Sequence, residues 1–350
     1  MKLLMVGDLS SAGHFLCQGF RELGIATTHI AYQNGWRKNP VEINMSSPHS
    51  GLRGRFHDYI KPLTLGHLIG YDAILFLDYF VFPRTFGINS FAIERLQEKN
   101  GPSFLWLIGC DSNMAKWGRT HNFELCNPCL SYDQKRLTCK HERDETAENN
   151  FLERIVKIIP GSHEYYESHL NNTKTTLPVQ LAVNVNEFPI RMAFKKERLN
   201  IFHGLNRYGF KGTHIVERVF NSLRNKYTEK ANFLINGKLP YKDYINLLAD
   251  QDVVVDQLFN KSLGINSLLS LASGKILVAG DPASGCADYK IPLPPMISCD
   301  PSISGLERSL TYLINNYNDL SFDADDSRSY VEQYHSPKLV AQKFINIFGW

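Results

Sequence analysis

The chain has 350 residues, of which 43% are hydrophobic and 21% charged, and these shares are ordinary for a globular protein. They exclude a disordered or fibrous chain, and the length predicts two domains rather than one core. The formal net charge of +3 is too small for a nucleic-acid-binding protein, so we expect no nucleic-acid partner.

The first residues, MKLLMVGDLSS, predict a buried strand, because the apolar run breaks at Gly7 and Asp8 before it reaches the length of a signal-peptide core. No stretch approaches the ~18 to 20 apolar residues that span a bilayer. We therefore expect a cytoplasmic protein. Its mildly basic charge is compatible with peripheral association at the inner face of a membrane.

The first half of the chain alternates between apolar strands and helical patterns. Lys2 to Val6, the helical segment FLCQGFRELG and the strand IATTHIAY form a β-α-β unit, and further strands are predicted at 73–80, 103–109 and 154–160. Such alternation predicts a parallel sheet with helices on both faces. We expect a Rossmann-like domain over 1–185, with a polar, Cys-containing insertion at about 114–150.

The second half repeats this alternation over 186–334. Strands are predicted in NIFHGL, NFLING, DVVVDQLF and KILVAGD, and helices from Thr213 to about Tyr227 and over YKDYINLLAD and INSLLSLASG. The last segment, SPKLVAQKFINIFGW, predicts an amphipathic helix at 335–350. The predicted fold class is therefore α/β, with two doubly wound domains.

The segment NIFHGLNRYGFKGTHIVERVF places two cations, Arg207 and Lys211, between a strand and the helix that begins at Gly212 and Thr213. Ligands of open α/β sheets bind at the carboxyl ends of the strands, where a helix N-terminus offers free N–H groups to a phosphate. The segment predicts a diphosphate site. The alternative is that both side chains are ordinary surface residues.

Residues 200–281 resemble the C-terminal donor domain of GT-B glycosyltransferases. The resemblance rests on HGLNRYGFKGT, LLADQDVVVDQLF, LGINSLLSLASGKILVAGD and the link PVQLAVNVNEFP. It implies two Rossmann-like domains with a cleft between them and a C-terminal helix that packs back on the first domain. It also implies a nucleotide-sugar donor whose phosphates are neutralised by Arg207 and Lys211, which would stabilise the charge that develops as the glycosidic bond breaks.

The sequence departs from this family at two positions. Retaining members carry two glutamates in an E-x7-E arrangement, and those positions are Lys261 and Leu269 here. A leucine cannot accept the hydrogen bonds of a donor ribose. Either Asn266, Ser267 or Asp256 holds the ribose, or the donor is unusual, or activity is lost.

The residues expected to bind the donor lie after three predicted elements. Asp256 and Gln257 follow a strand, although a strand-terminating or capping role is an equal alternative, and Gly264 would permit close backbone approach. The complete predicted set is Arg207, Lys211, Gly212, Asp256, Gln257, Gly264, Asn266 and Ser267.

Two loops of the first domain provide candidates for the acceptor side. GDLSSAGH carries Asp8, Ser10, Ser11, Gly13 and His14, and IGCDSN carries Cys110, Asp111 and Asn113. Asp111 or His14 is a candidate base for the acceptor hydroxyl. The alternatives are that Asp111 caps a helix and that His14 is an ordinary helix residue.

A cluster in the predicted insertion, CNPCLSYDQKRLTCKH, supplies Cys126, Cys129, Cys139 and His141, which is the number of ligands that tetrahedral zinc prefers. His121 or Cys110 could replace His141, and free thiols are the alternative to a structural zinc site. Four protein ligands would leave no open position, so we expect no catalytic metal.

The leading hypothesis is a glycosyltransferase that moves a sugar from a nucleotide-activated donor to a carbohydrate or lipid-linked acceptor, in bacterial surface polysaccharide or glycoconjugate synthesis. A nucleotide-sugar epimerase on the same scaffold is one alternative. The other is a non-catalytic descendant that binds carbohydrate or a partner, which Lys261 and Leu269 favour.

Overall fold

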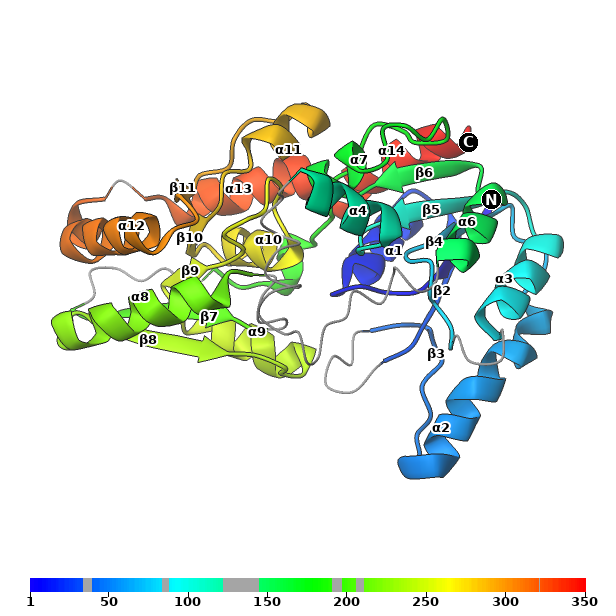
Figure 1. The fold of residues 1–350 in the computed structure, drawn as a ribbon, viewed down its shortest axis with the longest axis horizontal. Helices are drawn as coiled ribbons and strands as arrows, with labels where there is room; N and C mark the ends of the chain where they lie inside the picture. Colours follow the sequence, from blue (N-terminus) through cyan, green and yellow to red (C-terminus); the bar gives the residue numbers. More distant parts are fainter. Residues whose placement is uncertain (34–39, 84–87, 122–144, 191–196, 206–210, 321) are drawn as a thin grey trace. The chain divides into compact units, whose positions relative to one another are not determined.

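The computed structural model describes residues 1–33, 40–83, 88–121, 145–190, 197–205, 211–320 and 322–350, and it divides into two compact units (Figure 1). Unit 1 contains Met1–Ala115, Lys140–Ala182 and Pro337–Trp350, and unit 2 contains Lys116–Cys139 and Val183–Ser336. Each unit is built on its own parallel sheet.

Unit 1 holds six strands in the order β3-β2-β1-β4-β5-β6. The strands are β1 (Lys2–Val6), β2 (Ala26–Ala31), β3 (Ile43–Asn44), β4 (Ala73–Phe76), β5 (Ser103–Leu107) and β6 (Lys157–Pro160). The helices are α1 (Ala12–Glu22), α2 (Gly51–Ile60), η1 (Lys61–His67), α3 (Ile88–Glu98), α4 (Ser112–Thr120), which begins in this unit, α6 (Glu145–Glu153), α7 (His163–Glu167) and α14 (Pro337–Phe348).

The central strands β1, β4 and β5 of unit 1 are buried on both faces, which explains why their sequences are continuous apolar runs. Every residue of β4 and β5 is buried, as is β1 from its second residue onward. β1 pairs in parallel with both β2 and β4, and the sheet therefore reverses direction of growth at β1. This strand order is the one found in dinucleotide-binding domains.

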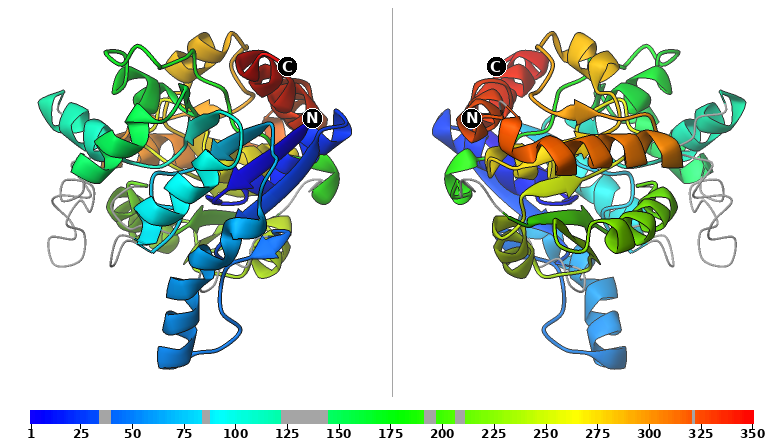
Figure 2. Two further views of the ribbon diagram at one scale, coloured as in Figure 1. Left: turned by 90° about the vertical axis from the view of Figure 1, so that its right-hand side faces the viewer. Right: turned by 90° about the vertical axis from the view of Figure 1, so that its left-hand side faces the viewer.

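The helix α14 completes unit 1 although it comes last in the chain. It packs against α1, and Figure 2 shows this helix, coloured dark red, beside the blue N-terminal segment. Phe344 contacts the rings of Phe20 and Trp106, with centroids 6.1 and 5.3 Å apart. Gly19 is required at the contact, because a Cβ there would lie 2.0 Å from the carbonyl oxygen of Pro337.

Unit 2 holds five strands in the order β11-β10-β9-β7-β8. The strands are β7 (Leu199–Gly204), β8 (Ala231–Asn236), β9 (Val253–Val255), β10 (Ile276–Ala279) and β11 (Ile297–Ser298). The helices are η4 (Val185–Glu187), α8 (Thr213–Lys226), α9 (Tyr241–Ala249), α10 (Ile265–Ala272), α11 (Ala283–Tyr289), α12 (Ile303–Asn316), η5 (Tyr317–Asp319) and α13 (Ala324–His335).

One face of the unit 2 sheet is covered by α8 and α12, whose buried residues form a single core with β7, β9 and β10. Figure 1 shows α8 lying along β7 and β8. Val216, Val219, Phe220 and Leu223 supply the apolar stripe of α8, at the spacing that a helix with one buried face requires. The contacts of α10 with β10 and α13 belong to this unit as well.

The predicted α/β class with two parallel sheets is confirmed. The segment at about 114–150, predicted to be an aperiodic insertion, is helical at both ends in the structure. The helices α4 and α6 occupy Ser112–Thr120 and Glu145–Glu153. Each of these helices has nine residues, which is shorter than the window of about 11 to 18 residues over which a helical period is read from sequence. No helix among the described residues combines the length and apolar character needed to cross a bilayer.

Candidate functional site

The unit 2 sheet changes its direction of growth between β7 and β9, which are neighbours in the sheet. In open α/β sheets, ligands bind outside the carboxyl ends of strands at such a switch point, because the connections leave the sheet toward opposite sides there. β7 ends at Gly204 and β9 at Val255. The candidate site is therefore built around these two strand ends.

His203 ties the two strand ends to the start of α8. It is fully buried, its Nδ1 donates to the carbonyl oxygen of Val255 at 2.8 Å, and its Nε2 accepts from the Thr213 hydroxyl at 2.9 Å. Burial, and then the nearby charge of Lys211, lower the pKa of His203 to about 4. The residue is a neutral imidazole that fixes the geometry of the turn.

Lys211 and Asp256 form a buried ion pair at the switch point. Lys211 Nζ donates to Asp256 Oδ1 at 2.8 Å, and the Ser267 hydroxyl donates to Oδ2 at 2.6 Å. The relative exposure of Asp256 is 0% and that of Lys211 is 6%. Burial alone would raise the pKa of Asp256, but the charge and hydrogen bond of Lys211 hold it below its ordinary value.

Two helices begin at this switch point without a capping side chain. The N-caps of α8 and α10 are Gly212 and Gly264, and neither helix receives a side-chain hydrogen bond at its N-cap. Gly212 has φ 73°, a left-handed conformation that glycine adopts without strain. The first-turn N–H groups and the positive ends of both helix dipoles therefore favour an anion.

The remaining predicted donor-side residues lie around these groups. The Gln257 amide packs on Gly264, where an added Cβ would lie 3.2 Å from Gln257 Nε2, and its Oε1 accepts a hydrogen bond from Asn260. Arg207 lies outside the described residues. The structure thus brings together Lys211, Gly212, Asp256, Gln257, Gly264, Asn266 and Ser267.

Sequence reasoning missed His203 and Thr213, and it treated Lys211 and Asp256 as separate groups. The signal for His203 was available, since it is a polar residue at the end of an apolar strand. The ion pair joins residues 45 positions apart, and only the parallel pairing of β7 with β9 brings them together.

In unit 1 the corresponding switch point lies between β1 and β4. Here the helix N-terminus is already occupied, because Asp8 Oδ1 accepts from the Gly13 N–H at 2.8 Å and Oδ2 from the Ser11 N–H at 3.3 Å. His29 is buried and donates from Nε2 to the carbonyl oxygen of Gly7 at 2.8 Å. Burial lowers the pKa of His29.

The turn between β1 and α1 is tightly built. Ser10 and Ser11 have φ 55° and 68°, which is uncommon for residues other than glycine. A Cβ on Gly13, the second residue of α1, would lie 2.7 Å from the His29 ring, so this position requires glycine. His14 lies within α1, and its Nε2 is 3.0 Å from Gln18 Nε2.

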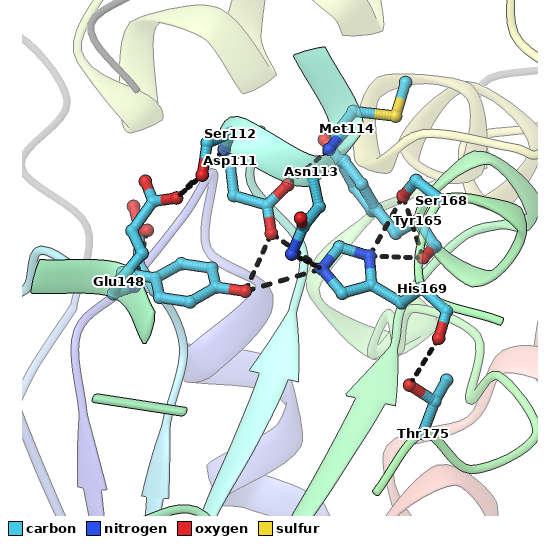
Figure 3. A network of polar contacts seen from close by, with 11 residues as sticks. Asp111, Ser112, Asn113, Met114, Glu148, Tyr165, Ser168, His169 and Thr175 are labelled. Carbon is cyan, nitrogen blue, oxygen red and sulfur yellow. Dashed lines mark hydrogen bonds and ion pairs between the residues drawn. The ribbon is translucent and has the colours of Figure 1, made fainter. Parts of the chain in front are cut away.

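The second acceptor-side candidate, Asp111, is the centre of a buried network (Figure 3). Its Oδ1 accepts from the Met114 N–H at 2.7 Å, which is the helix-capping role that the sequence left open. Its Oδ2 accepts from the Tyr79 hydroxyl at 2.7 Å and lies 2.8 Å from His169 Nε2. Burial would raise the pKa of Asp111, but His169 and the other donors hold it low.

His169 completes this network through its other ring nitrogen. Nδ1 lies 3.0 Å from the carbonyl oxygen of Tyr165, and Figure 3 shows the ring between that carbonyl and Asp111. The ring therefore lies between two hydrogen-bond acceptors, the Tyr165 carbonyl oxygen and the Asp111 carboxylate. Beside it, Glu148 Oε2 accepts from the Ser112 N–H at 3.0 Å and from the Ser112 hydroxyl.

Full burial and three described contacts make the Asp111 carboxylate a structural anchor in this conformation. Asn113 also belongs to this region, with Nδ2 3.5 Å from His169 Nε2. Cys110 Sγ lies 3.7 Å from the Tyr165 hydroxyl.

The predicted zinc ligands Cys126, Cys129, Cys139 and His141 lie outside the described residues. Among the residues that the structure describes, no group of three or more His, Cys, Asp or Glu side chains is placed to hold a metal ion. The four described free cysteines are Cys17, Cys110, Cys286 and Cys299.

The whole chain is similar to solved glycosyltransferase structures. TarM from S. aureus, in a complex with fondaparinux, alpha-GlcNAc-glycerol and UDP, matches with a TM-score of 0.64 and 11% identity over 100% of both chains. The fold is that of the GT-B glycosyltransferases. The resemblance inferred from the sequence is confirmed at the level of the fold.

Two further structures cover the chain equally well. HepE from Anabaena, in complex with UDP-glucose, matches with a TM-score of 0.60 and 13% identity over 100% of this chain and 99% of HepE. Sucrose-phosphate synthase from Thermosynechococcus elongatus matches with a TM-score of 0.61 and 11% identity over 100% of this chain and 98% of the synthase. No protein-family model and no curated protein sequence matches the chain.

Proposed function

We propose that this protein is a glycosyltransferase that takes a sugar from a nucleoside-diphosphate donor and transfers it to a glycan or lipid-linked glycan. The observation that carries the proposal is the switch point of unit 2, where α8 and α10 begin without capping side chains beside the Lys211 ammonium. Open helix N-termini and a cation at one strand edge are complementary to a diphosphate.

Lys211 binds the donor phosphate and Asp256 holds Lys211 in place. The ammonium group has three hydrogens, and the described contacts use one of them for Asp256 Oδ1. Stabilising the charge on the leaving diphosphate is the principal catalytic contribution that this arrangement offers. Arg207 is proposed as a second phosphate ligand, and the reaction is proposed to proceed without a catalytic metal.

The neighbouring structures support the donor class. HepE was solved with UDP-glucose, and TarM with UDP and two carbohydrates. We extend this to a nucleotide-sugar donor and a glycan acceptor for the present chain, in surface polysaccharide or glycoconjugate synthesis. His14, at the start of α1, is the proposed acceptor-side base, since the carboxylate of Asp111 is already bound by buried donors.

One observation favours a non-catalytic protein as the second candidate. Leu269 occupies the position at which retaining members carry a ribose-binding glutamate, and it is buried with a relative exposure of 3%. Lys261, at the other glutamate position, is exposed. A protein that had lost donor binding would tolerate both residues.

Nucleotide binding separates the two candidates. The ligands to titrate are the uridine, guanosine, cytidine, adenosine and thymidine diphosphates and the corresponding nucleotide sugars. In thermal-shift and calorimetric titrations, we expect the nucleotides of one base to bind saturably and to raise the melting temperature of the protein. The Lys211→Met/Asp256→Asn double variant removes both charges without leaving either buried alone, and we expect it to weaken that binding at least about ten-fold.

Lys230→Met, at an exposed position of the same unit, is the matched control and should bind like the wild type. Absence of stabilisation across the whole panel would favour the non-catalytic candidate. Release of the nucleotide diphosphate with transfer to an added glycan, measured by mass spectrometry, separates a transferase from an epimerase, which would return an isomerised donor.

A further inference from the structure

Several polar side-chain atoms of unit 2 are buried with no hydrogen bond formed among the described residues, and two of them are the Tyr244 hydroxyl oxygen and Asn266 Nδ2. An unmade hydrogen bond of a buried hydroxyl or amide costs about 1–3 kcal/mol, so these atoms need an explanation. Both lie at the switch point.

Tyr244 reaches this position from α9, whose start follows β8 in the chain. Its ring centroid is 6.1 Å from that of Phe202, the residue before His203 in β7. Burial raises the pKa of Tyr244, and the negative charge of Asp256 raises it further. The hydroxyl is therefore near the Asp256 carboxylate and at the carboxyl end of β7.

Asn266 lies in the first turn of α10, one residue before Ser267. Its amide is close enough to Asp256 to favour the ionised carboxylate, although Nδ2 makes no hydrogen bond of good geometry. On its other side is Gly204, where an added Cβ would lie 3.5 Å from Nδ2. The absence of a side chain at Gly204 thus leaves a methyl-sized space beside the amide.

The charges around these two atoms define the ligand that they would accept. Both can donate a hydrogen bond, and the tyrosine oxygen can also accept one. The Lys211 ammonium is already the proposed phosphate ligand, whereas a hydroxyl can accept from the Asn266 amide and donate to the tyrosine oxygen. The arrangement fits hydroxyl groups of a sugar ring.

We propose that Tyr244 and Asn266 form a hydroxyl-binding subsite at the carboxyl ends of β7 and β9, which takes ring hydroxyls of the nucleotide-sugar donor. The inference rests on the proposed function and adds specificity to it. The subsite would also give the donor polar partners in unit 2, where Leu269 cannot form a hydrogen bond. The hydroxyls belong either to the ribose or to the transferred sugar.

The test compares two tyrosines of α9. Tyr244→Phe removes the unpartnered hydroxyl, and we expect about five-fold weaker binding of the nucleotide sugar, with no loss of stability in the ligand-free protein. Tyr241→Phe is the matched control, because the Tyr241 hydroxyl donates to Glu187 Oε2 at 3.2 Å. It should lower the melting temperature and leave the affinity unchanged.

A second variant tests the same subsite by filling it. Gly204→Ala places a methyl group 3.5 Å from Asn266 Nδ2, an ordinary contact that the folded protein accommodates. The methyl group occupies the space that a ligand hydroxyl would need. We expect Gly204→Ala to weaken donor binding more than about five-fold at near wild-type stability.

The source of the hydroxyls is resolved by ligand choice. If Tyr244→Phe weakens the binding of the nucleoside diphosphate and of the nucleotide sugar equally, and does not change the affinity for 2′- or 3′-deoxy nucleotides, the subsite holds ribose. If the substitution weakens only the binding of the nucleotide sugar, the subsite holds the transferred sugar. Either result supports the inference.

Three other results overturn it. If the wild-type protein binds the donor and both Tyr244→Phe and Gly204→Ala bind it with the same affinity, the subsite is refuted and the proposed function is unaffected. A wild-type protein that binds no nucleotide or nucleotide sugar refutes both. Lower stability of ligand-free Tyr244→Phe, comparable with that of Tyr241→Phe, would mean that the hydroxyl already has a partner.

Discussion

The two switch points of this protein share one construction and differ in where the negative charge comes from. Each has a buried histidine that donates to a carbonyl oxygen at a strand end, His29 to Gly7 in unit 1 and His203 to Val255 in unit 2. In unit 1 the helix that follows is capped by the carboxylate of Asp8. In unit 2 the helix α8 has no capping side chain.

The difference teaches how one topology serves two purposes. A helix N-terminus attracts an anion whether the anion belongs to the protein or to a ligand. Unit 1 provides its own carboxylate, which fixes the β1–α1 turn. Unit 2 pairs its carboxylate, Asp256, with Lys211 instead, and this leaves the starts of α8 and α10 open.

The largest effect is expected from breaking the unit 2 ion pair. Asp256→Asn leaves the Lys211 ammonium buried without a counter-charge, and should lower the free energy of unfolding by about 3–5 kcal/mol in urea denaturation. Adding Lys211→Met should recover most of this loss. Asp243→Asn, at an exposed carboxylate of α9, is the control and should change little. A small effect of Asp256→Asn would mean that the pair is solvated.

The next effect is a pH dependence that belongs to His203. Its folded pKa of about 4 lies below the ordinary 6.5, so the unfolded chain binds more protons between these values and stability falls as the pH falls. Across that window the loss attributable to His203 should approach ~3 kcal/mol.

This dependence is measured as a difference between proteins. Urea denaturation of wild type and His203→Asn at several pH values should give a flatter profile for the variant, because carboxylates titrate in both. Parallel profiles would show that the imidazole is not held neutral. His29→Asn probes unit 1 in the same way, with a change of the same sign because the pKa of His29 is also lowered.

The smallest effect is expected from opening the unit 1 helix. Asp8→Ala removes the acceptor for the Ser11 and Gly13 N–H groups, and should lower the free energy of unfolding by about 1–2 kcal/mol. Glu22→Ala, at the other end of α1, removes a carboxylate from the unfavourable end of the dipole and should not destabilise. Equal losses in both variants would rule out a capping role for Asp8.

The fold could be predicted from the sequence because the central strands of both sheets are continuous apolar runs and the long helices between them have one apolar face. It also located the β7–α8 turn, since a cation before a glycine at a helix start is a local pattern. The cap made by Asp111 was weighed correctly as an alternative, because its hydrogen bond to the Met114 N–H spans three residues.

The contacts that define the candidate site were not predictable from local patterns. Lys211 and Asp256 are 45 residues apart, and Tyr79 lies 90 residues from His169, so only the sheet brings each pair together. Tyr244 lies in an amphipathic helix, where its hydroxyl gives no signal that it lacks a partner. Burial and pairing depend on tertiary structure, which periodicity does not encode.

The position of α14 in unit 1 bears on how the chain is made. The face of α1 that carries Phe20 is covered by Phe344, a residue synthesised only after every strand of unit 2. When the first 182 residues have left the ribosome, the nascent chain therefore exposes an apolar surface on α1. This surface stays uncovered until α14 has been synthesised. During translation, unit 2 can finish its core before unit 1, the reverse of their order in the gene.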